Sequence, residues 1–357
     1  GRQRPRLVRF ELLTSTPLSP TEGSGTFVAI DGLVRGLAAL GHTVAVRPLT
    51  LRTRFHTLDR WLYNLGVALR PRAADVTVGV DLDGFLWARR RRGPLVVMLK
   101  GIIAPELRNE RGWVRVLLSM QARWERLNTE RADRVIVPSR YSASVAHEVY
   151  GIPEAKLAIV PEPIDLADWR RRFADAARPR AGRPTILSVA RMYPRKRLED
   201  LLHAAAILRT RISDAQIRIV GQGPESARLH LLHQKLALGD TVVLLGEVSR
   251  SRLAVEYTIA HCFCLPTVQE GFGLVFAEAM AAGLPVVACR AAAVPEIVED
   301  GRTGILVGRR NPAELAHALE MLLVNENLRT EFGLAATRRI EAFDLPRVAG
   351  RFLETLP

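Results

Sequence analysis

The stretch CFCLPTVQEGFGLVFAEAMAA, residues 262–282, sets the fold class. Its apolar start, Cys262–Leu265, predicts a buried strand, and Val275–Ala282 predicts a helix. Gly271 and Gly273 lie between the two. Glycines at such a place let the backbone approach a ligand closely, and the helix start offers unpaired N–H groups and a positive dipole end. The stretch therefore predicts an anion site at the carboxyl edge of a parallel sheet, where open α/β folds bind ligands.

Two carboxylates flank this predicted anion site. Glu270 precedes the glycines, and Glu278 follows eight residues later, about one turn into the helix. Both can face one ligand from different ends. Taken alone, the motif is more typical of a tight turn with two solvated glutamates.

A second feature supplies positive charge. In SVARMYPRKR, residues 188–197, Arg191 follows a predicted strand, and Pro194 bends the loop so that Lys196 returns towards the sheet edge. A guanidinium fork and an ammonium point charge together suit a diphosphate. We expect the neighbouring Arg195 and Arg197 at the surface. A third feature, VGQGP at 220–224, adds a strand-to-helix turn that is a weak signal by itself.

The same alternation of short apolar runs and amphipathic segments continues along the chain, which is typical of parallel α/β sheets. It predicts two doubly wound domains with a cleft between them. The expected strands are Leu7–Leu13, Thr43–Pro48, Val76–Val80, Leu95–Leu99, Arg134–Val137 and Ala158–Val160, then Thr185–Val189, Gln216–Val220, Thr241–Leu244, Cys262–Leu265, Pro285–Ala288 and Gly304–Val307. Helices are expected between them, among others at 26–40, 111–128 and 142–150.

Length and composition limit the alternatives. The chain has 357 residues, of which 48% are hydrophobic and 25% charged, so two folded domains are expected and disorder is excluded as the main character. Three cysteines are too few for a disulfide scaffold and favour a reducing compartment. Cys262 and Cys264 are expected to be buried core thiols. An apolar run of about 18 residues, as a spanning helix needs, does not occur. We expect the natural chain to begin before Gly1.

The charge is uneven. Residues 1–180 hold 30 Lys and Arg against 18 Asp and Glu, a net +12, whereas residues 181–357 hold 21 against 19, a net +2. A polyanionic partner for the first half is one explanation, such as an anionic membrane, a phosphorylated acceptor or nucleic acid. The other is genome composition, because only four of the 51 basic residues are Lys.

Together these motifs resemble the retaining glycosyltransferases of family four, which have the GT-B fold. The resemblance covers nearly the whole chain, and its most specific part is the pair of glutamates around Gly-Phe-Gly. It is carried by Gly23-Ser-Gly25, Leu40-Gly-His-Thr-Val44, Val135-Ile-Val-Pro-Ser139, Val160-Pro-Glu-Pro-Ile-Asp165, Arg191 to Lys196, Gly221 to Pro224, Glu270 to Glu278, Ala281-Ala-Gly-Leu-Pro285 and Pro295-Glu-Ile-Val-Glu-Asp-Gly301.

The resemblance implies a role for each site residue. Arg191 and Lys196 would hold the diphosphate of a nucleotide sugar and stabilise it as it leaves. Glu278 would bind the ribose hydroxyls, and Glu270 would hold the donor sugar. The remaining donor contacts would come from the amides of Gly271, Phe272, Gly273 and Leu274, from Ser24 and Gly25 once the cleft closes, and from Gly221 and Gly223, against which base and ribose would pack.

The chain departs from the family pattern at three places. Lys100 stands where a His near the reacting carbon is usual, and we expect it to line the cleft. Lys196-Arg197 replaces a usual Lys-Gly. Pro161-Glu162-Pro163 replaces an Asn-Gly turn and is expected only to stiffen the linker.

The resemblance therefore implies two Rossmann-like doubly wound domains facing a central cleft: an acceptor-binding domain at 1–168 with 343–357, a linker at 169–184, and a nucleotide-sugar domain at 185–342. The expected function is retaining transfer of a hexosyl unit from a UDP- or GDP-linked donor to an acceptor hydroxyl, on a sugar, a lipid or a phosphorylated molecule. Neither cofactor nor metal is expected, because the stabilising charges come from side chains and a helix dipole. The expected location is cytoplasmic, with possible contact between the basic domain and the inner membrane face, and no nucleic acid is expected.

Two rival functions stay open. The first is another GT-B activity, a disaccharide or disaccharide-phosphate synthase or a phosphorylase-like enzyme, which uses much the same donor pocket. The second is a non-catalytic polyanion-binding protein that uses the basic first half.

Overall fold

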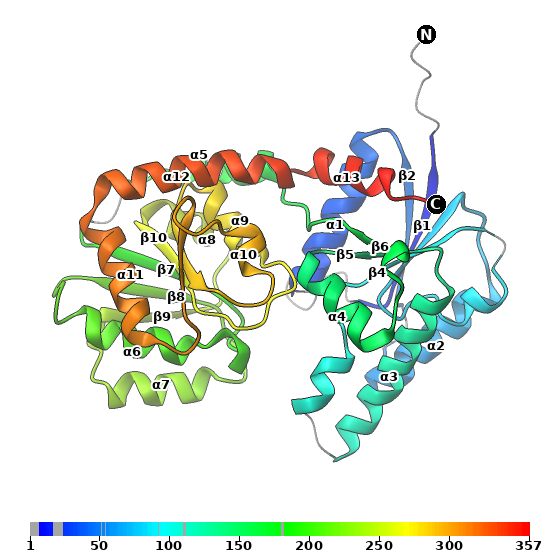
Figure 1. Cartoon of the computed structure of the whole chain (residues 1–357), viewed down its shortest axis with the longest axis horizontal. Coiled ribbons are helices and arrows are strands. Elements are labelled where there is room, and N and C mark those ends of the chain that lie inside the picture. The colour runs from blue at the N-terminus through cyan, green and yellow to red at the C-terminus, as the bar shows by residue number, and fades with distance from the viewer. Residues whose placement is uncertain are drawn as a thin grey trace, which may run out of the picture. The chain divides into compact units, whose positions relative to one another are not determined.

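The computed structural model describes residues 7–16, 24–50, 52–53, 55–91, 93–109, 112–179 and 182–357. The chain divides into two compact units. Unit 1 comprises 1–163 and 345–357, and unit 2 comprises 164–344. Each unit contains one parallel sheet with helices on its two faces (Figure 1).

The sheet of unit 1 has six parallel strands in the order β2-β1-β3-β4-β5-β6. Its four inner strands are largely buried, as expected for a sheet that helices cover on both faces. The direction of winding reverses between β1 and β3, where β1 pairs Phe10 with Val76 and, on its other side, Arg9 with Thr43. The strands are β1 (Arg9–Thr14), β2 (Thr43–Pro48), β3 (Val76–Val80), β4 (Leu95–Met98), β5 (Arg134–Val137) and β6 (Leu157–Ile159).

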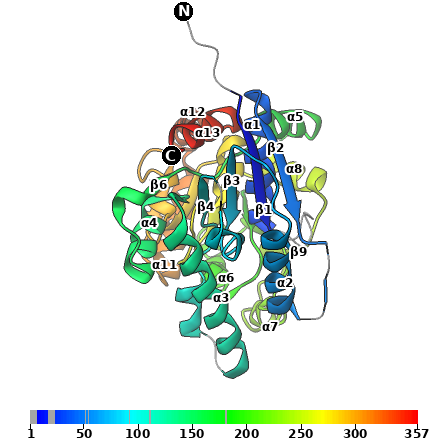
Figure 2. The ribbon, with the colours of Figure 1, turned by 90° about the vertical axis from the view of Figure 1, so that its right-hand side faces the viewer.

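Five α-helices and three 3-10 turns connect or cover these strands in the described part of unit 1. Figure 2 shows the ribbon turned by 90° about the vertical axis. The α-helices are α1 (Ser24–Ala39), α2 (His56–Leu69), α3 (Gly112–Arg131), α4 (Arg140–Tyr150) and α13 (Leu345–Glu354); the 3-10 turns are η1 (Trp87–Arg89), η2 (Ala104–Asn109) and η3 (Glu154–Lys156).

The sheet of unit 2 has the order β12-β11-β10-β7-β8-β9. Counted within the unit, this is 6-5-4-1-2-3, the doubly wound order in which winding reverses between the first and fourth strands. That reversal lies between β7 and β10, which pair Cys262 with Ile186. The strands are β7 (Thr185–Val189), β8 (Gln216–Val220), β9 (Val242–Gly246), β10 (Cys262–Leu265), β11 (Val286–Cys289) and β12 (Gly304–Val307).

The helices of unit 2 bury one continuous apolar core against this sheet, with Phe263 and Phe276 fully enclosed. They are α5 (Leu166–Asp175), α6 (Leu198–Leu208), α7 (Ser226–Lys235), α8 (Arg250–Ile259), α9 (Leu274–Ala281), α10 (Val294–Ile297), α11 (Pro312–Val324) and α12 (Glu326–Ile340), with the 3-10 turns η4 (Pro194–Lys196), η5 (Gly239–Thr241) and η6 (Glu341–Phe343).

The end of the chain belongs to unit 1. Val348, Ala349 and Phe352 of α13 are buried in the same core cluster as β1 and α1. A Cβ at Gly36 of α1 would lie 2.7 Å from the carbonyl oxygen of Leu345, so the missing side chain permits this close packing. The C-terminal segment thus returns to the first unit (Figure 1).

The segment 169–184, expected as a linker, contains more structure than the sequence suggested. Residues 169–175 form the end of α5, which begins at Leu166 and is capped by the Asp165 side chain. Trp169 is buried against Tyr257 and Phe173. Residues 180 and 181 lie outside the described part of the chain. The helix forms because Leu166, Trp169 and Phe173 recur on one face, which offsets the Arg-rich composition.

Among the helices that the structure describes, none combines the length and apolar character that crossing a bilayer requires.

Candidate functional site

The predicted site residues of unit 2 follow the two strands at which its sheet reverses direction. Arg191 and Lys196 come after β7, and Glu270 comes after β10. β7 and β10 are neighbours in the sheet. The crevice outside the carboxyl ends of strands at such a reversal is where doubly wound domains bind ligands.

Lys196 and Glu270 form an ion pair at this edge. The Lys196 ammonium donates to Oε1 of Glu270, and only 12% and 11% of the two side chains remain exposed. Thr267 Oγ1 donates to the same Oε1 at 3.0 Å. The fold thus brings together two residues that are 74 positions apart in sequence.

Hydrogen bonds hold the loop after β7 and the loop after β10 against each other. The amide of Val268 donates to the carbonyl of Arg195 at 3.0 Å, and Thr267 Oγ1 lies 3.3 Å from the same carbonyl oxygen. The amide of Ala293 donates to the carbonyl of Glu270 at 3.2 Å. Loops after three strands thus hold the Lys196–Glu270 pair in place.

The glycine-lined start of α9 lies beside this pair. Gly273 has φ of +94°, the left-handed conformation that favours glycine, and immediately precedes the first helical residue, Leu274. Phe272 is buried and packs edge-on against Phe343 with centroids 5.4 Å apart. The first amides of a helix have no partner within the helix, so the start of α9 is suited to an anion.

Glu278 lies within α9 and is half-buried. Tyr257 Oη donates to its Oε2 at 3.0 Å. Burial raises the pKa of Glu278 to about 7, against the opposing effect of the Tyr257 hydrogen bond. The hydroxyl occupies one carboxylate oxygen, so Oε1 has no side-chain donor among the contacts of the described chain.

Arg191 is exposed at the start of the loop that follows β7. Its guanidinium carbon lies 5.8 Å from the centroid of the Tyr193 ring, and the guanidinium carbon of Arg195 lies 5.0 Å from that centroid. The Tyr193 ring thus contacts two guanidinium groups of the loop that also carries Lys196. The role of Arg191 on a diphosphate stays a prediction.

Gly221 and Gly223 have a structural role at the end of β8. A Cβ at Gly221, where φ is +123°, would lie 2.0 Å from the carbonyl oxygen of Ala190. A Cβ at Gly223 would lie 2.7 Å from the amide nitrogen of Met192. The two glycines therefore let the β8 loop pack directly on the β7 loop. Packing of a base and ribose against them stays a prediction.

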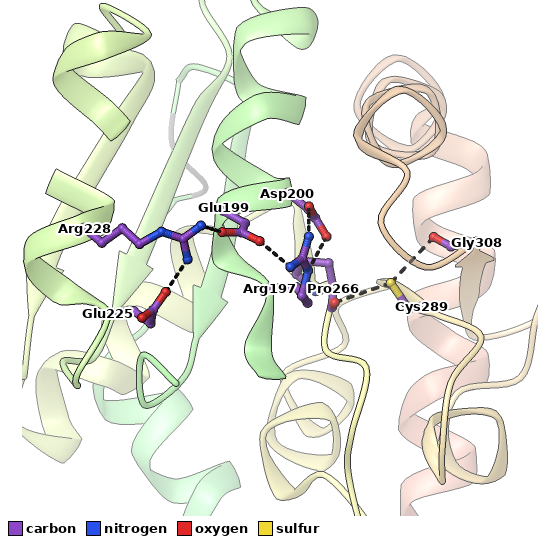
Figure 3. A network of polar contacts seen from close by, with 8 residues as sticks. All are labelled: Arg197, Glu199, Asp200, Glu225, Arg228, Pro266, Cys289 and Gly308. Carbon is purple, nitrogen blue, oxygen red and sulfur yellow. Dashed lines mark hydrogen bonds and ion pairs between the residues drawn. The ribbon is translucent and has the colours of Figure 1, made fainter. Parts of the chain in front are cut away.

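Arg197 is the first correction that the structure makes to the sequence interpretation. It is not a free surface charge: its guanidinium donates to both oxygens of Asp200 at 2.8 and 3.0 Å and pairs with Glu199 (Figure 3). Glu199 and Glu225 pair in turn with Arg228. Arg197 has φ of +52°, so it adopts the conformation for which the usual glycine at this position is suited.

Figure 3 also shows how Cys289 joins two neighbouring loops. Its Sγ lies 3.4 Å from the carbonyl oxygen of Pro266 and 3.8 Å from that of Gly308. Burial raises the pKa of the Cys289 thiol to about 11, so it stays protonated as a donor. Cys262 and Cys264 are also buried free thiols, as the sequence predicted.

In unit 1, Lys100 follows β4 at the carboxyl edge of the sheet. Its ammonium donates to Glu162 Oε2 at 2.6 Å, and 6% and 8% of the two side chains are exposed. Its amide donates to Asp81 Oδ1 at 2.7 Å. Glu162 therefore does more than stiffen the chain, which corrects the sequence interpretation. A catalytic role for Lys100 stays a prediction.

Ser24 and Gly25 are the first two residues of α1. Gly25 is exposed. The Ser24 side chain and Gly23 lie outside the described part of the chain. The predicted contact of this loop with a diphosphate stays a prediction.

Sequence reasoning missed a polar cluster at the carboxyl edge of unit 1. Buried Asp83 accepts hydrogen bonds from the amide and the hydroxyl of Ser15 at 2.6 and 2.8 Å. Arg60 of α2 donates through Nε to Ser15 Oγ at 2.9 Å and through a terminal nitrogen to Gln121 at 3.0 Å. The Ser15 and Asp83 loops follow β1 and β3, where this sheet reverses direction. Only the apolar strand preceding Asp81 and Asp83 signalled this edge in the sequence.

The fold and this geometry agree with comparisons to known proteins. Residues 170–339 match the family described as Glycosyl transferases group 1, and residues 77–168 match Glycosyltransferase Family 4. The D-inositol 3-phosphate glycosyltransferase 2 of Catenulispora acidiphila is 34% identical over 227 residues, which are 60% of this chain and 53% of that protein. A GDP-mannose-dependent alpha-(1-6)-phosphatidylinositol monomannoside mannosyltransferase of Mycobacterium tuberculosis is 32% identical over 222 residues, 59% of this chain and 57% of that protein.

Solved structures show the same fold along the whole chain. A sucrose-phosphate synthase from Thermosynechococcus elongatus has a TM-score of 0.78 at 21% identity and covers 98% of both chains. Anabaena HepE in complex with UDP and glucose has a TM-score of 0.75 at 18% identity and covers 98% of this chain and 99% of its own. The chain spans about half the length of the curated relatives it matches. The two family matches and the two doubly wound sheets place the chain among the group 1 glycosyltransferases, with the GT-B fold.

Proposed function

We propose that the chain transfers a hexosyl unit from a UDP- or GDP-linked sugar to an acceptor hydroxyl, with retention of the anomeric configuration. The observation that carries the proposal is the Lys196–Glu270 pair beside the start of α9, at the strand reversal of unit 2. The curated relatives named above are glycosyltransferases, and one of them uses GDP-mannose.

The leaving diphosphate sets the chemical problem. As the bond between the anomeric carbon and the phosphate oxygen breaks, positive charge develops on the sugar and negative charge on the phosphate. The Lys196 ammonium, the exposed Arg191 guanidinium and the first amides of α9 would stabilise that negative charge. We propose that these groups stabilise the leaving group without a metal ion. Unchanged turnover in EDTA is expected.

The two glutamates would orient the donor. The ionised Glu278 accepts hydrogen bonds from the ribose hydroxyls, and Glu270 accepts them from the hexose once the diphosphate has engaged Lys196. The acceptor oxygen attacks from the face that the nucleotide leaves, and its proton passes to the departing phosphate oxygen. Retention follows from attack on that face.

For the acceptor, we propose a molecule that carries a phosphate, as a free sugar or inositol phosphate or as a lipid headgroup. The names of both curated relatives contain such a group. The supporting feature in this chain is Arg60 at the carboxyl edge of unit 1. Its guanidinium donates to two uncharged oxygens, Ser15 Oγ and Gln121 Oε1. An Arg60→Gln variant is expected to raise the KM for the acceptor and leave hydrolysis of the donor unchanged.

The decisive experiment is a panel of UDP- and GDP-sugars, scored by thermal shift and by release of nucleotide with and without acceptor. Lys196→Ala is expected to lower kcat by about 100-fold or more, the usual effect of removing one stabilising group. Lys235→Ala is the matched control, because Lys235 is an exposed lysine of α7 in the same unit. No turnover with any donor, or equal kcat in both variants, would refute the proposal.

The same panel separates the two rival functions. A synthase releases a soluble disaccharide or its phosphate from a soluble acceptor, whereas a lipid-directed transferase needs the lipid. A polyanion-binding protein keeps its affinity for a polyanion after Lys196→Ala and Glu270→Gln, and it has no turnover to lose.

A further inference from the structure

The two carboxylate oxygens of Glu278 have different surroundings. Oε2 accepts a hydrogen bond from the Tyr257 hydroxyl at 3.0 Å, which joins α9 to α8. Oε1 has no side-chain donor within the described part of the chain. Glu278 is only partly buried. One oxygen is therefore held by the protein, and the other is left for a ligand.

Tyr257 is fixed in place by aromatic neighbours. Its side chain is fully buried, and its ring stacks on Phe263 of β10 with centroids 6.2 Å apart. Trp169 and Phe173 of α5 meet the same ring edge-on at 5.7 and 6.0 Å. These contacts lie on several sides of the ring, so the hydroxyl has one fixed position. Burial and the neighbouring Glu278 raise the pKa of Tyr257 well above its ordinary 10, so the hydroxyl keeps its proton and donates.

Arg250, the first residue of α8, is the nearest cation to this carboxyl group. Its guanidinium carbon lies 5.1 Å from the Trp169 ring centroid, and a terminal nitrogen lies 3.9 Å from Asp168 Oδ2. The positive charge lowers the pKa of Glu278, but 42% of the Arg250 side chain is exposed. Solvent therefore screens this effect more than it screens the buried hydrogen bond.

Helix α12 also packs on α9, but at its far end. There Gly333 lies against the carbonyl of Gly283. The charged residues of α12 have other surroundings: Arg329 and Arg339 donate to backbone carbonyls outside α9, and Glu326, Glu331 and Arg338 are exposed. Within α9 itself Glu278 is the one charged residue. Tyr257 and Arg250 are thus the groups of the described chain that set the ionisation of Glu278.

Two opposing effects meet at Glu278. Burial favours the protonated form and raises the pKa to about 7, whereas the Tyr257 hydrogen bond favours the ionised form. The difference matters for a ligand with hydroxyl groups. An ionised carboxylate oxygen accepts strong hydrogen bonds from hydroxyls, and a protonated acid has lost part of that capacity.

We propose that Tyr257 is a positioning residue for nucleotide binding, whose hydroxyl keeps Glu278 ionised and turns Oε1 towards the ribose hydroxyls of the donor. That Glu278 binds a ribose rests on the proposed function. The coupling between Tyr257 and Glu278 does not depend on it, so the two can be tested separately.

The first test needs no nucleotide. Carbon-13 NMR of the full chain, labelled at the glutamate carboxyl carbons, gives the titration midpoint of Glu278, and Glu278→Gln identifies its signal. Tyr257→Phe keeps the ring and removes only the hydroxyl. The midpoint is expected to rise by about one pH unit or more, the size expected for a lost hydrogen bond to a charged group. The matched control is Tyr63→Phe, which removes a buried hydroxyl that donates to the Arg47 carbonyl in unit 1, and it is expected to leave the midpoint unchanged.

A second variant separates the hydrogen bond from the nearby charge. Arg250→Gln is expected to raise the midpoint by less than Tyr257→Phe, and its effect is expected to fade in high salt because the guanidinium is partly exposed. The effect of Tyr257→Phe is expected to persist in high salt. A midpoint that Tyr257→Phe leaves unchanged would overturn the proposal.

The second test is calorimetry with UDP and GDP and with their 2′,3′-dideoxy analogues. For the nucleotide that the wild type binds, Tyr257→Phe is expected to lower the affinity by about fivefold or more at pH 7, because a midpoint one unit higher leaves far less Glu278 ionised. The dideoxy analogue has no hydroxyls for Glu278 and is expected to bind both proteins alike. Equal losses for the two ligands would indicate a general structural defect and overturn the positioning role. A wild type that binds neither nucleotide would refute the proposed function and the ribose role with it, while the NMR titration would still decide the coupling.

Discussion

Replacement of Arg197 by glycine sets two opposing effects against each other. Glycine removes the strain of a left-handed conformation, φ of +52° in the wild type, which costs a non-glycine residue about 1 to 2 kcal/mol. It also removes the guanidinium that pairs with Asp200 and Glu199. The two effects have opposite signs, so the sequence alone does not give the sign of their sum.

The burial of the partners decides the sign. The exposed side-chain fractions are 21% for Arg197, 7% for Asp200 and 14% for Glu199. Removing one member of a fully buried pair costs about 3 to 5 kcal/mol, because the other charge is left unpaired. Partial exposure of Arg197 and the remaining Glu199–Arg228 pair reduce this to roughly 3 kcal/mol. After the strain relief, Arg197→Gly is expected to destabilise unit 2 by about 1 to 2 kcal/mol.

Two assays check this estimate. Urea unfolding gives the change in stability, and hydrogen exchange of the α6 amides shows whether the opening is local. The control is Arg302→Gly, which removes an exposed pair with Glu299 in which 74% of the arginine side chain is accessible. Such a pair contributes about 1 kcal/mol or less. An Arg197→Gly variant as stable as the wild type would show that strain outweighs the ion pairs, and the reasoning would be refuted.

Three further predictions concern glycine packing and buried carboxyls. Gly221→Ala is expected to destabilise unit 2 by at least about 3 kcal/mol in urea unfolding, because its Cβ would overlap the carbonyl oxygen of Ala190. The control is Gly350→Ala in α13, where a Cβ would meet open space. This variant is expected to stabilise the protein by about 0.5 to 1 kcal/mol. Calorimetry is expected to show nucleotide affinity falling up to tenfold per pH unit below about 7 as Glu278 takes up its proton, and Glu278→Gln abolishes that slope. Burial and nearby Asp81 raise the pKa of Glu125 to about 8 from an ordinary 4.5, so between these pH values the folded state keeps a proton that the unfolded state has lost. The free energy of unfolding is therefore expected to fall as the pH rises from about 4.5 to about 8. In Glu125→Gln it is expected to fall less over the same range.

The inner strands were predictable because they are short and buried on both faces. Val76–Val80, Thr185–Val189 and Cys262–Leu265 begin and end at the predicted residues and are buried along their whole length. Their order in the sheet was not predictable, because an apolar run does not specify which strand lies beside it. α5 was missed although Leu166, Trp169 and Phe173 follow helical spacing, because arginines dominate the composition of that segment.

The candidate site was predictable where its residues are local in sequence. The start of α9 follows directly from the two glycines between a strand and a helix. Lys100 and Glu162 are 62 positions apart, and no local pattern joins them. Arg197 and Asp200 did carry a signal, since a basic and an acidic residue three apart can pair around a helix start.

The ion pairs place a condition on how the proposed donor binds. Lys196 is already neutralised by Glu270, so a diphosphate that reaches it exchanges one anionic partner for another. Little net Coulomb energy is gained at that lysine, because a partly buried charge remains paired before and after. The favourable part of binding must come from groups that lack an anion beforehand, above all the first amides of α9. Removal of the lysine should therefore affect kcat more than donor affinity, and substitutions that distort the start of α9 should affect both.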